Sequence, residues 1–343
     1  MRAVVIHSAK DLRIEERDPD VVGPGQVAVR IEVGGICGSD LHYYNHGGFG
    51  TVRLREPMVL GHEIAGTITE VAPDVAGLRV GDRVAVNPSR PCRACRFCLD
   101  GLPNQCLNMR FYGSAMPMPH IQGGFRETLV CDAAQCETAS RVGPGVLAMA
   151  EPFAVALHAI SRAGPLLGRR VLVTGCGPIG ALVVVAARLH GAAEIIVTDI
   201  VDEPLAIASR LGADRTINVA ADPDALKPYA DQKGRVDVML ECSGNERALR
   251  AGLEVLAPRG TMVQLGLGGD MSLPQNVVVA KELAIVGSFR FHAEFGLAVR
   301  LLDAGRVDLA PLITASFGLD DARMAFEAAN DRRRSMKVQL LMR

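Results

Sequence analysis

The stretch VLVTGCGPIG, residues 171–180, decides the fold of this 343-residue chain. Apolar, strand-forming residues run into three glycines with Gly-x-Gly-x-x-Gly spacing, and the apolar segment 179–190 that follows has a helical pattern. Gly175 can make the tight turn, Gly177 lets the backbone approach a pyrophosphate, and Gly180 lets the helix pack closely on the strand. The stretch therefore predicts a strand, turn and helix that bind a dinucleotide at the helix N-terminus.

An acidic residue after the next predicted strand supports this interpretation. Asp199 follows Gly180 by 19 residues, and its carboxylate can bind a ribose 2′-hydroxyl but would repel a 2′-phosphate. Residues 200–209 contain no Lys or Arg, so NAD is favoured over NADP. The alternative is a plain glycine turn in an α/β domain. The predicted cofactor-binding residues are Gly175, Gly177, Pro178, Ile179, Gly180 and Asp199.

The pattern on either side of this stretch predicts two domains. Residues 153–286 alternate apolar strands with helices, as in a doubly wound parallel sheet of Rossmann type. The first 152 residues form short strands broken by Gly and Pro, which predicts a β-rich, barrel-like domain. From about residue 283 the chain leaves the alternating rhythm, and because the first domain lacks a helical cover, we expect residues 287–343 to return to it.

Composition narrows the function classes. Lys and Arg number 37 against 38 Asp and Glu, and only 4% of the residues are aromatic, so a nucleic-acid partner is not expected. The N-terminus has no signal-peptide pattern, and the longest charge-free run, 171–187, is too short and Gly-rich for a membrane span. A reducing cytoplasm is therefore expected, where clustered thiols more often bind metal than form disulfides.

Four of the nine cysteines are clustered within residues 90–108. Cys92, Cys95, Cys98 and Cys106 are separated by two, two and seven residues, so they can close a tetrahedral all-sulfur shell around one zinc ion. A closed shell leaves no position for substrate, which predicts a structural zinc site. An iron–sulfur cluster or unligated thiols are the alternatives, and Leu107 stands where a ferredoxin pattern has proline.

A second set of possible metal ligands is dispersed along the chain. Cys37 lies in GGICGSDLHYY, His62 and Glu63 in GHE, and Glu151 in the motif EPFAVALHA. Taken singly, Cys37 could be a buried thiol and His62 a satisfied core histidine. Their spacing alone does not show that they converge.

Together these motifs resemble the zinc-dependent medium-chain dehydrogenases, specifically the sorbitol and polyol branch. The resemblance runs nearly end to end and rests on GHEIAGTITEVAPDVAGLRVGDRVAV at 61–86, the cysteine lobe, GCGPIG and GSFRF. It implies a GroES-like, β-rich catalytic domain and an enzyme that transfers hydride between NAD and a secondary alcohol. It further implies a homodimer or homotetramer.

The resemblance also assigns roles to single residues. Cys37, His62 and Glu63 match catalytic zinc ligands, and Glu151 would be a further ligand, direct or through water. We favour water, because a second directly bound carboxylate makes the shell anionic and weakens zinc as a Lewis acid. Ser39 and His42 match a relay that carries the alcohol proton through the cofactor ribose to the outer histidine, although a turn-capping serine and an exposed histidine are the plain alternatives.

The substrate predicted from the resemblance is a sugar acid, with a neutral polyol as the alternative. Arg110 and Arg290 lie in segments that the resemblance places near the pocket, and an arginine can hold a carboxylate with two hydrogen bonds. Both could instead be surface ion-pair residues, and Tyr43 could contact substrate hydroxyls or only line the cleft. A different class of function, a non-catalytic NAD-binding redox sensor or scaffold, would need no open metal site.

Overall fold

The computed structural model describes residues 1–342, which divide into two compact units. Unit 1 comprises Met1–Glu151, Phe295–Asp331 and the segment from Lys337 onward, and unit 2 comprises Pro152–Glu294 and Arg332–Met336. The sequence prediction ended the first segment at residue 152 and resumed it at 287. In the structure, the second segment of unit 1 resumes at Phe295.

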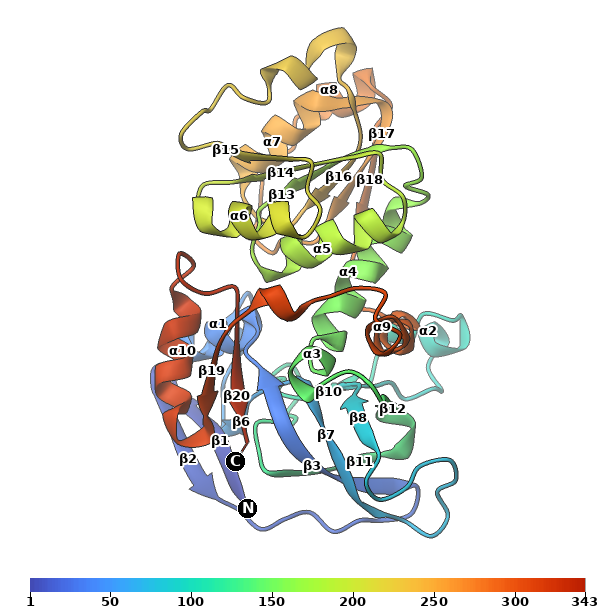
Figure 1. Ribbon diagram of the computed structural model, residues 1–343, viewed down its shortest axis with the longest axis vertical. Helices are drawn as coiled ribbons and strands as arrows, with labels where there is room; N and C mark the ends of the chain where they lie inside the picture. The colour runs from blue at the N-terminus through green and yellow to red at the C-terminus, as the bar shows by residue number, and fades with distance from the viewer. Residues whose placement is uncertain (343) are drawn as a thin grey trace. The chain divides into compact units, whose positions relative to one another are not determined.

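Unit 2 is built on a six-stranded, fully parallel sheet in the order β15-β14-β13-β16-β17-β18. The strands are β13 (Arg170–Thr174), β14 (Glu194–Asp199), β15 (Arg215–Asn218), β16 (Val236–Glu241), β17 (Leu256–Gln264) and β18 (Ala284–Gly287). Helices α5 (Pro178–Leu189) and α6 (Asp202–Arg210) lie on one face of the sheet, and α7 (Glu246–Val255) lies on the other (Figure 1). This is the predicted doubly wound Rossmann arrangement, with the strand order reversing between β13 and β16.

The last strand of this sheet, β18, falls where the alternating rhythm was expected to end, near residue 283. It pairs in parallel with β17 and forms one edge of the sheet. Its residues Ala284 and Ile285 are exposed, so the strand lacks the uniformly apolar environment of an inner parallel strand. That exposure explains why its pattern did not resemble that of the other strands.

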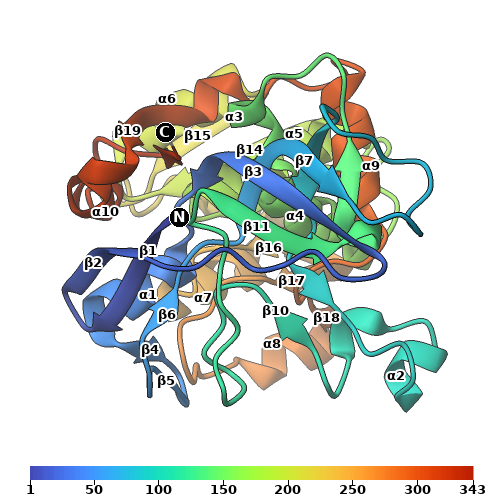
Figure 2. The same ribbon diagram turned by 90° about the horizontal axis from the view of Figure 1, so that it is seen from below.

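Unit 1 is β-rich, as predicted. Its main sheet has the order β12-β8-β7-β3-β20-β19, with β11 also pairing with β3, and a second sheet has the order β2-β1-β6 (Figure 2). The strands of these sheets are β1 (Arg2–Ser8), β2 (Asp11–Glu16), β3 (Gln26–Gly35), β6 (Met58–Val59), β7 (Glu63–Val71), β8 (Arg83–Val86), β11 (Thr128–Asp132), β12 (Cys136–Thr138), β19 (Ile313–Gly318) and β20 (Lys337–Leu341). Two short pairs, β4 (Gly48–Phe49) with β5 (Val52–Arg53) and β9 (Ser89–Arg90) with β10 (Arg110–Phe111), complete the unit.

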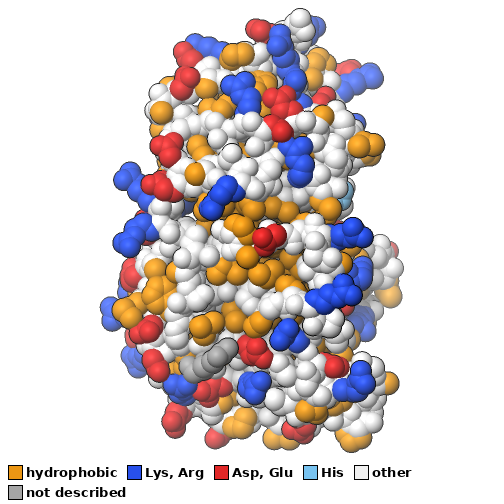
Figure 3. Space-filling model, viewed as in Figure 1, with side chains coloured by type: hydrophobic (Ala, Val, Ile, Leu, Met, Phe, Trp, Pro, Cys, Tyr) orange, Lys and Arg blue, Asp and Glu red, His pale blue; other side chains and the backbone are white. Residues whose placement is uncertain are grey.

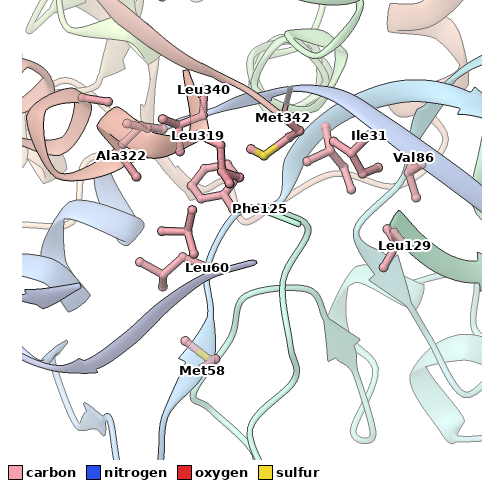
Figure 4. Packing of buried hydrophobic residues seen from close by; sticks show 14 of the residues in the cluster. Ile31, Met58, Leu60, Val86, Phe125, Leu129, Leu319, Ala322, Leu340 and Met342 are labelled. Carbon is pink, nitrogen blue, oxygen red and sulfur yellow. The ribbon is translucent and has the colours of Figure 1, made fainter. Parts of the chain in front are cut away.

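The C-terminal segment is part of the core of unit 1. Strand β20 pairs with β3, and Leu340 and Met342 pack in one cluster with Phe125 and Leu60 (Figure 4). Helix α10 (Ala322–Asn330) adds Phe326, whose ring lies edge-on to Phe125 at 6.3 Å between centroids. Each such side chain contributes roughly 1.5–3 kcal/mol on burial, so the last residues of the chain stabilise the sheet that carries the first predicted metal ligands.

The remaining helices are short or buried. They are α1 (Gly38–His46), α2 (Arg96–Leu99), α3 (Pro144–Leu147), α4 (Ala150–Ala163), α8 (Gln275–Ala280) and α9 (Glu294–Asp303). The helical stretch Pro144–Ala163 is long and apolar enough to cross a membrane by length and composition, but 67% of it is buried within the structure, as in a core helix. On the face shown in Figure 3, acidic and basic side chains are interspersed, in keeping with the net charge of −1.

Candidate functional site

The first candidate site begins where β3 ends and α1 starts. Cys37 is the N-cap of α1, and its backbone N–H donates to the Asp40 carboxylate at 3.0 Å. The other Asp40 oxygen accepts from the N–H of Gly61 at 3.2 Å. Asp40, which is completely buried, therefore joins the loop that carries Cys37 to the loop that precedes His62.

Three of the predicted zinc ligands converge at this point. His62 directly precedes β7, and Glu63 is the first residue of that strand. One ligand atom each from Cys37, His62 and Glu63 lies within 4.8 Å of the others, and His62 and Glu63 are buried. A thiolate, an imidazole and a carboxylate with an additional open position are a donor set that suits catalytic zinc.

The electrostatic environment of His62 suits a cation-binding site. Its Nδ1 is buried, lies 3.8 Å from Asp40 Oδ1 and has no hydrogen-bond partner among the described residues. Burial alone would lower the pKa of His62, but the charges of Asp40 and then Cys37 raise it well above its ordinary value. The two anionic side chains beside this buried imidazole favour a positive charge at this point, which a bound cation would supply in place of the imidazolium proton.

Glu151 lies in the first turn of α4 and is buried, with 6% of its surface exposed. It stands outside the group of three ligand atoms, although its charge contributes to raising the pKa of His62. This placement agrees with contact through a water, and the role of Glu151 remains a prediction.

Lys337 was not anticipated from the sequence. Its ammonium lies 2.7 and 2.8 Å from the two carboxylate oxygens of Glu63, and both side chains are almost completely buried. Lys337 is the first residue of β20, some 270 positions from Glu63. No local motif marks such a contact, because it depends on the pairing of the last strand with β3.

The residues predicted to act beside the metal lie on α1. Ser39 is half-buried and His42 is exposed. Partial burial, and then the charge of His46, lower the pKa of His42, so its imidazole is neutral at pH 7 and can accept a proton. Tyr43 is buried, and its hydroxyl accepts the backbone N–H of Ala115 at 2.9 Å, so it supports the wall of the site.

The two arginines predicted to contact substrate differ in their setting. Arg110 is exposed, while its neighbour on β10, Phe111, lies against the His62 ring at 5.4 Å between centroids. Since successive side chains of a strand point to opposite faces, Arg110 is directed away from His62. Arg290 belongs to unit 2 and stacks on Phe289. Contact of either arginine with substrate remains a prediction.

The second candidate site is the cysteine lobe. The sulfurs of Cys92, Cys95, Cys98 and Cys106 all lie within 4.8 Å of one another. Cys95 Sγ is 3.6 Å from Cys98 Sγ and 3.9 Å from Cys106 Sγ. A zinc–sulfur bond of about 2.3 Å in a tetrahedron places sulfurs about 3.8 Å apart, so the lobe has the dimensions of an all-sulfur zinc site.

The backbone of the lobe is arranged to stabilise thiolates. The N–H of Cys95 points at Cys92 Sγ, and the N–H groups of Cys92 and Asn108 point at Cys106 Sγ. Hydrogen bonds from the N–H groups of Ala94 and Cys95 lower the pKa of Cys92 to about 6, whereas burial and the neighbouring Cys95 raise that of Cys98 to about 12. The lobe therefore favours the thiolate form at some of its cysteines, and a bound cation would be needed to keep all four as thiolates.

The third candidate site is the predicted dinucleotide turn of unit 2. Gly175 has φ +82°, a conformation that favours glycine, and a Cβ on it would lie 2.7 Å from that of Ser243. A Cβ on Gly180 would lie 1.9 Å from the carbonyl oxygen of Gly175, which accounts for the close packing of α5 on the turn. Pro178 and Ile179 open α5, and the free N–H groups of its first turn, which Pro178 itself lacks, would face a phosphate bound there.

Asp199 ends β14, as predicted, and its carboxylate is also tied to the backbone. It accepts N–H bonds from Cys176 at 2.6 Å and from Ile200 at 2.7 Å. Arg332, which the sequence interpretation missed, lies over the turn, with its guanidinium 3.6 Å from the position of a Cβ on Gly177. The turn therefore brings together a helix N-terminus, a fixed carboxylate and a basic side chain.

Comparison with known proteins identifies the family. Residues 23–141 match the alcohol dehydrogenase GroES-like domain, and residues 178–304 match the zinc-binding dehydrogenase domain. The L-idonate 5-dehydrogenase (NAD(P)(+)) of Escherichia coli is 40% identical over 99% of this chain and 98% of its own. The chain belongs to the zinc-dependent alcohol dehydrogenase family. As a zinc-dependent alcohol dehydrogenase, it is an NAD(P)-dependent oxidoreductase with a GroES-like and a Rossmann part, as the sequence predicted.

Other relatives of this dehydrogenase support the polyol branch. The sorbitol dehydrogenase of Gallus gallus is 36% identical over 98% of this chain and 95% of its own. A crystal structure of the L-idonate 5-dehydrogenase of Escherichia coli superimposes with a TM-score of 0.95 and covers 99% of this chain and 97% of that one. The family, the fold and the redox class are therefore established, and the substrate is a matter for proposal.

Proposed function

We propose that this dehydrogenase oxidises a secondary alcohol of a sugar acid with NAD, and that it converts L-idonate to 5-keto-D-gluconate. The observation that carries the proposal is the convergence of Cys37, His62 and Glu63, with the His62 Nδ1 atom lacking a hydrogen bond among the described residues. The 40% identity to an L-idonate 5-dehydrogenase supports the choice of substrate.

The chemistry needs a polarised alcohol oxygen. Zinc held by Cys37, His62 and Glu63 would favour the alkoxide form of the substrate, in the way that bound zinc lowers the pKa of water from about 15.7 to about 7. The surrounding chain keeps these ligands in place: Asp40 orients the backbone on both sides of the cluster, and Phe111 packs against the His62 ring. Ser39 would take the alcohol proton, and the neutral, exposed His42 would pass it to solvent.

A basic cavity beside α1 supports an anionic substrate. The cavity has a volume of about 200 Å³ and is lined by Thr51, Val52, Arg53, Arg55, Ala115, Met116, Pro117, Met118 and His120. Ala115 is the residue that bonds the Tyr43 hydroxyl, so the cavity borders the helix that begins at Cys37. Two guanidinium groups and no lining carboxylate favour a carboxylate end of the substrate there, with Arg110 and Arg290 as the predicted alternatives.

Within the same reaction class, a neutral polyol such as sorbitol, xylitol or galactitol is the second candidate. The 36% identity to a sorbitol dehydrogenase favours it. A non-catalytic redox sensor would bind NAD without requiring an open metal site. The buried group of Cys37, His62 and Glu63 disfavours that function.

NAD rather than NADP is proposed as the physiological cofactor. Asp199 presents a fixed carboxylate at the end of β14, where it would repel a 2′-phosphate. The name of the Escherichia coli relative gives NAD(P)(+) as its cofactor, so the cofactor preference of this chain must be measured separately.

We also propose a cytoplasmic homodimer or homotetramer. Strand β18 is a sheet edge with exposed Ala284 and Ile285, and an unpaired edge of this kind can add a second copy. Light scattering of the purified protein measures the assembly directly.

The experiment that tests the function is NADH formation across L-idonate, other sugar acids and neutral polyols, with and without a zinc chelator. We expect the highest kcat/KM with L-idonate and NAD, and loss of activity on chelation. Activity that ignores chelation, or that requires NADP, would contradict the proposal.

A further inference from the structure

The pair formed by Lys337 and Glu63 calls for a functional explanation. A buried ion pair loses the hydration of both charges, and apolar side chains of the same size often give equal or greater stability. Here Lys337 is 2% exposed and Glu63 is 1% exposed. Stability alone therefore does not account for an ammonium placed on a carboxylate beside the open metal site.

The hydrogen-bonding capacity of the Lys337 ammonium is fully used. Its ammonium has three N–H donors, and three acceptors surround it: the two Glu63 oxygens at 2.7 and 2.8 Å and the carbonyl oxygen of Ile36 at 3.2 Å. Ile36 directly precedes Cys37, and its own N–H donates to Val338 at 2.9 Å. The last strand thus fixes the ammonium against both segments that supply metal ligands.

The charges around the cluster are otherwise negative. Cys37, Asp40, Glu63 and Glu151 are potential anions, and Lys337 is the one buried lysine among the described residues. His62 must be neutral to bind a metal. A divalent ion with four anions would leave a net charge of −2, whereas the ammonium reduces this to −1. Lys337 therefore offsets part of the charge that would weaken zinc as a Lewis acid.

We propose that Lys337 is a positioning residue for the catalytic zinc: it holds the Glu63 carboxylate in place and competes with zinc for its oxygens. The ammonium contacts both Glu63 oxygens, so a zinc ion held by Glu63 would share that carboxylate with Lys337. This inference rests on the proposed catalytic zinc site. Lys337 thereby lowers the affinity of Glu63 for zinc and reduces the negative charge around the ion.

The test is a double-mutant cycle with Lys337→Met, Glu63→Gln and the double variant, read out as zinc affinity in chelator competition without substrate or NAD. Lys337→Met leaves a buried, unpaired carboxylate in the metal-free protein, and zinc binding relieves it. We expect catalytic-site zinc to bind at least tenfold more tightly in Lys337→Met, with no such gain in the double variant. The melting temperature should fall mainly in the metal-free form.

Two further variants separate positioning from simple stability. Lys337→Arg retains a cation that can bond both oxygens and should restore zinc affinity to within about threefold of wild type. Lys281→Met is the matched control, because Lys281 donates to three backbone carbonyls in unit 2, and its loss should lower stability equally with and without zinc.

The outcomes distinguish this inference from the proposed function. Equal or weaker zinc binding by Lys337→Met, with an equal loss of stability in both forms, would overturn the role of Lys337 alone. A wild-type protein that binds zinc only in the cysteine lobe would overturn both proposals before any variant is made.

Discussion

The cysteine lobe and the Cys37 cluster are two candidate zinc sites built on opposite principles. The lobe takes four like donors from 15 consecutive residues, Cys92 to Cys106, and three of these cysteines are only half-buried. The cluster takes three different donors from two segments, buries two of them, and adds a lysine from the last strand. A site that only has to hold a metal can be local, whereas a site that must leave a position open depends on the fold to fix its donors.

The largest expected effect comes from removing the thiolate of the cluster. Cys37→Ala should lower kcat by about a thousandfold or more, equivalent to about 4 kcal/mol, because zinc loses an anionic ligand and the alkoxide loses its support. Elemental analysis should show zinc falling from about two ions per chain to about one.

The matched change in the lobe is Cys92→Ser. It should also remove about one zinc, but it should lower the melting temperature while the remaining folded enzyme keeps its kcat within about tenfold. If Cys92→Ser abolished turnover as fully as Cys37→Ala without unfolding the protein, the division into a structural and a catalytic site would be wrong.

An ion pair in unit 2 shows, through its pH dependence, how much a buried charge contributes to stability without a metal. In unit 2, Glu294 pairs with His158 at 3.0 Å, and both side chains are largely buried. Burial alone would raise the pKa of Glu294, but the bonds from His158 and the N–H of His292 lower it to about 2. Because the folded pKa lies below the unfolded value near 4.5, the pair contributes up to about 3 kcal/mol above pH 4.5, and this is lost as pH falls toward 2.

Urea unfolding of Glu294→Gln should therefore show a stability deficit at pH 7 that narrows progressively below pH 4.5. The control is Glu246→Gln, which breaks an exposed helical pair with Arg250 and should leave stability nearly unchanged at every pH. A deficit of constant size from pH 7 to pH 3 would show that the Glu294 charge is not its cause.

The basic cavity beside α1 should influence the choice of substrate. Arg55→Ala should lower kcat/KM for L-idonate by about tenfold to a hundredfold, the range expected for a charged hydrogen bond, and that for sorbitol by less than about threefold. Arg110→Ala and Arg290→Ala, assayed in parallel, test the sites predicted from the sequence. If all three variants oxidise L-idonate as well as wild type, no arginine among them binds the carboxylate.

The smallest expected effect is at the cofactor turn. Asp199→Asn keeps the shape of the side chain but removes the charge that repels a 2′-phosphate, so the ratio of kcat/KM for NADP to that for NAD should rise about tenfold. Asp202→Asn, at the start of α6, is the control and should leave the ratio near that of wild type. An unchanged ratio in Asp199→Asn would mean that another residue sets cofactor choice.

The parts of the structure that could be predicted from the sequence are those determined by residues close together in the chain. The glycine turn, strands β13, β14, β16 and β17 of the Rossmann sheet and the cysteine lobe each follow from spacing or periodicity within a short stretch. The β-rich character of unit 1 also followed from short strands broken by Gly and Pro, among them β8 at Arg83–Val86. The return of the C-terminal segment to unit 1 was also predicted, because the strands of the first domain lacked helices to cover them.

The parts that could not be predicted depend on contacts between distant segments. The approach of Cys37 to His62 requires the pairing of β3 with β7, and only the family resemblance suggested it. The contacts of Lys337 and Arg332 require the last strand and the loop before it, which carry no motif. The edge strand β15 was not predicted, because Arg215 and Thr216 are exposed and lack the pattern of an inner strand.

The measurement that tests the central claim most directly is zinc content followed together with turnover during stepwise chelation. The wild-type enzyme should begin with about two zinc ions per chain, lose L-idonate-dependent NADH formation as the first ion leaves, retain its folded structure with the second, and recover activity when zinc is restored. Full activity with only one zinc ion, held by the cysteine lobe, would contradict the account.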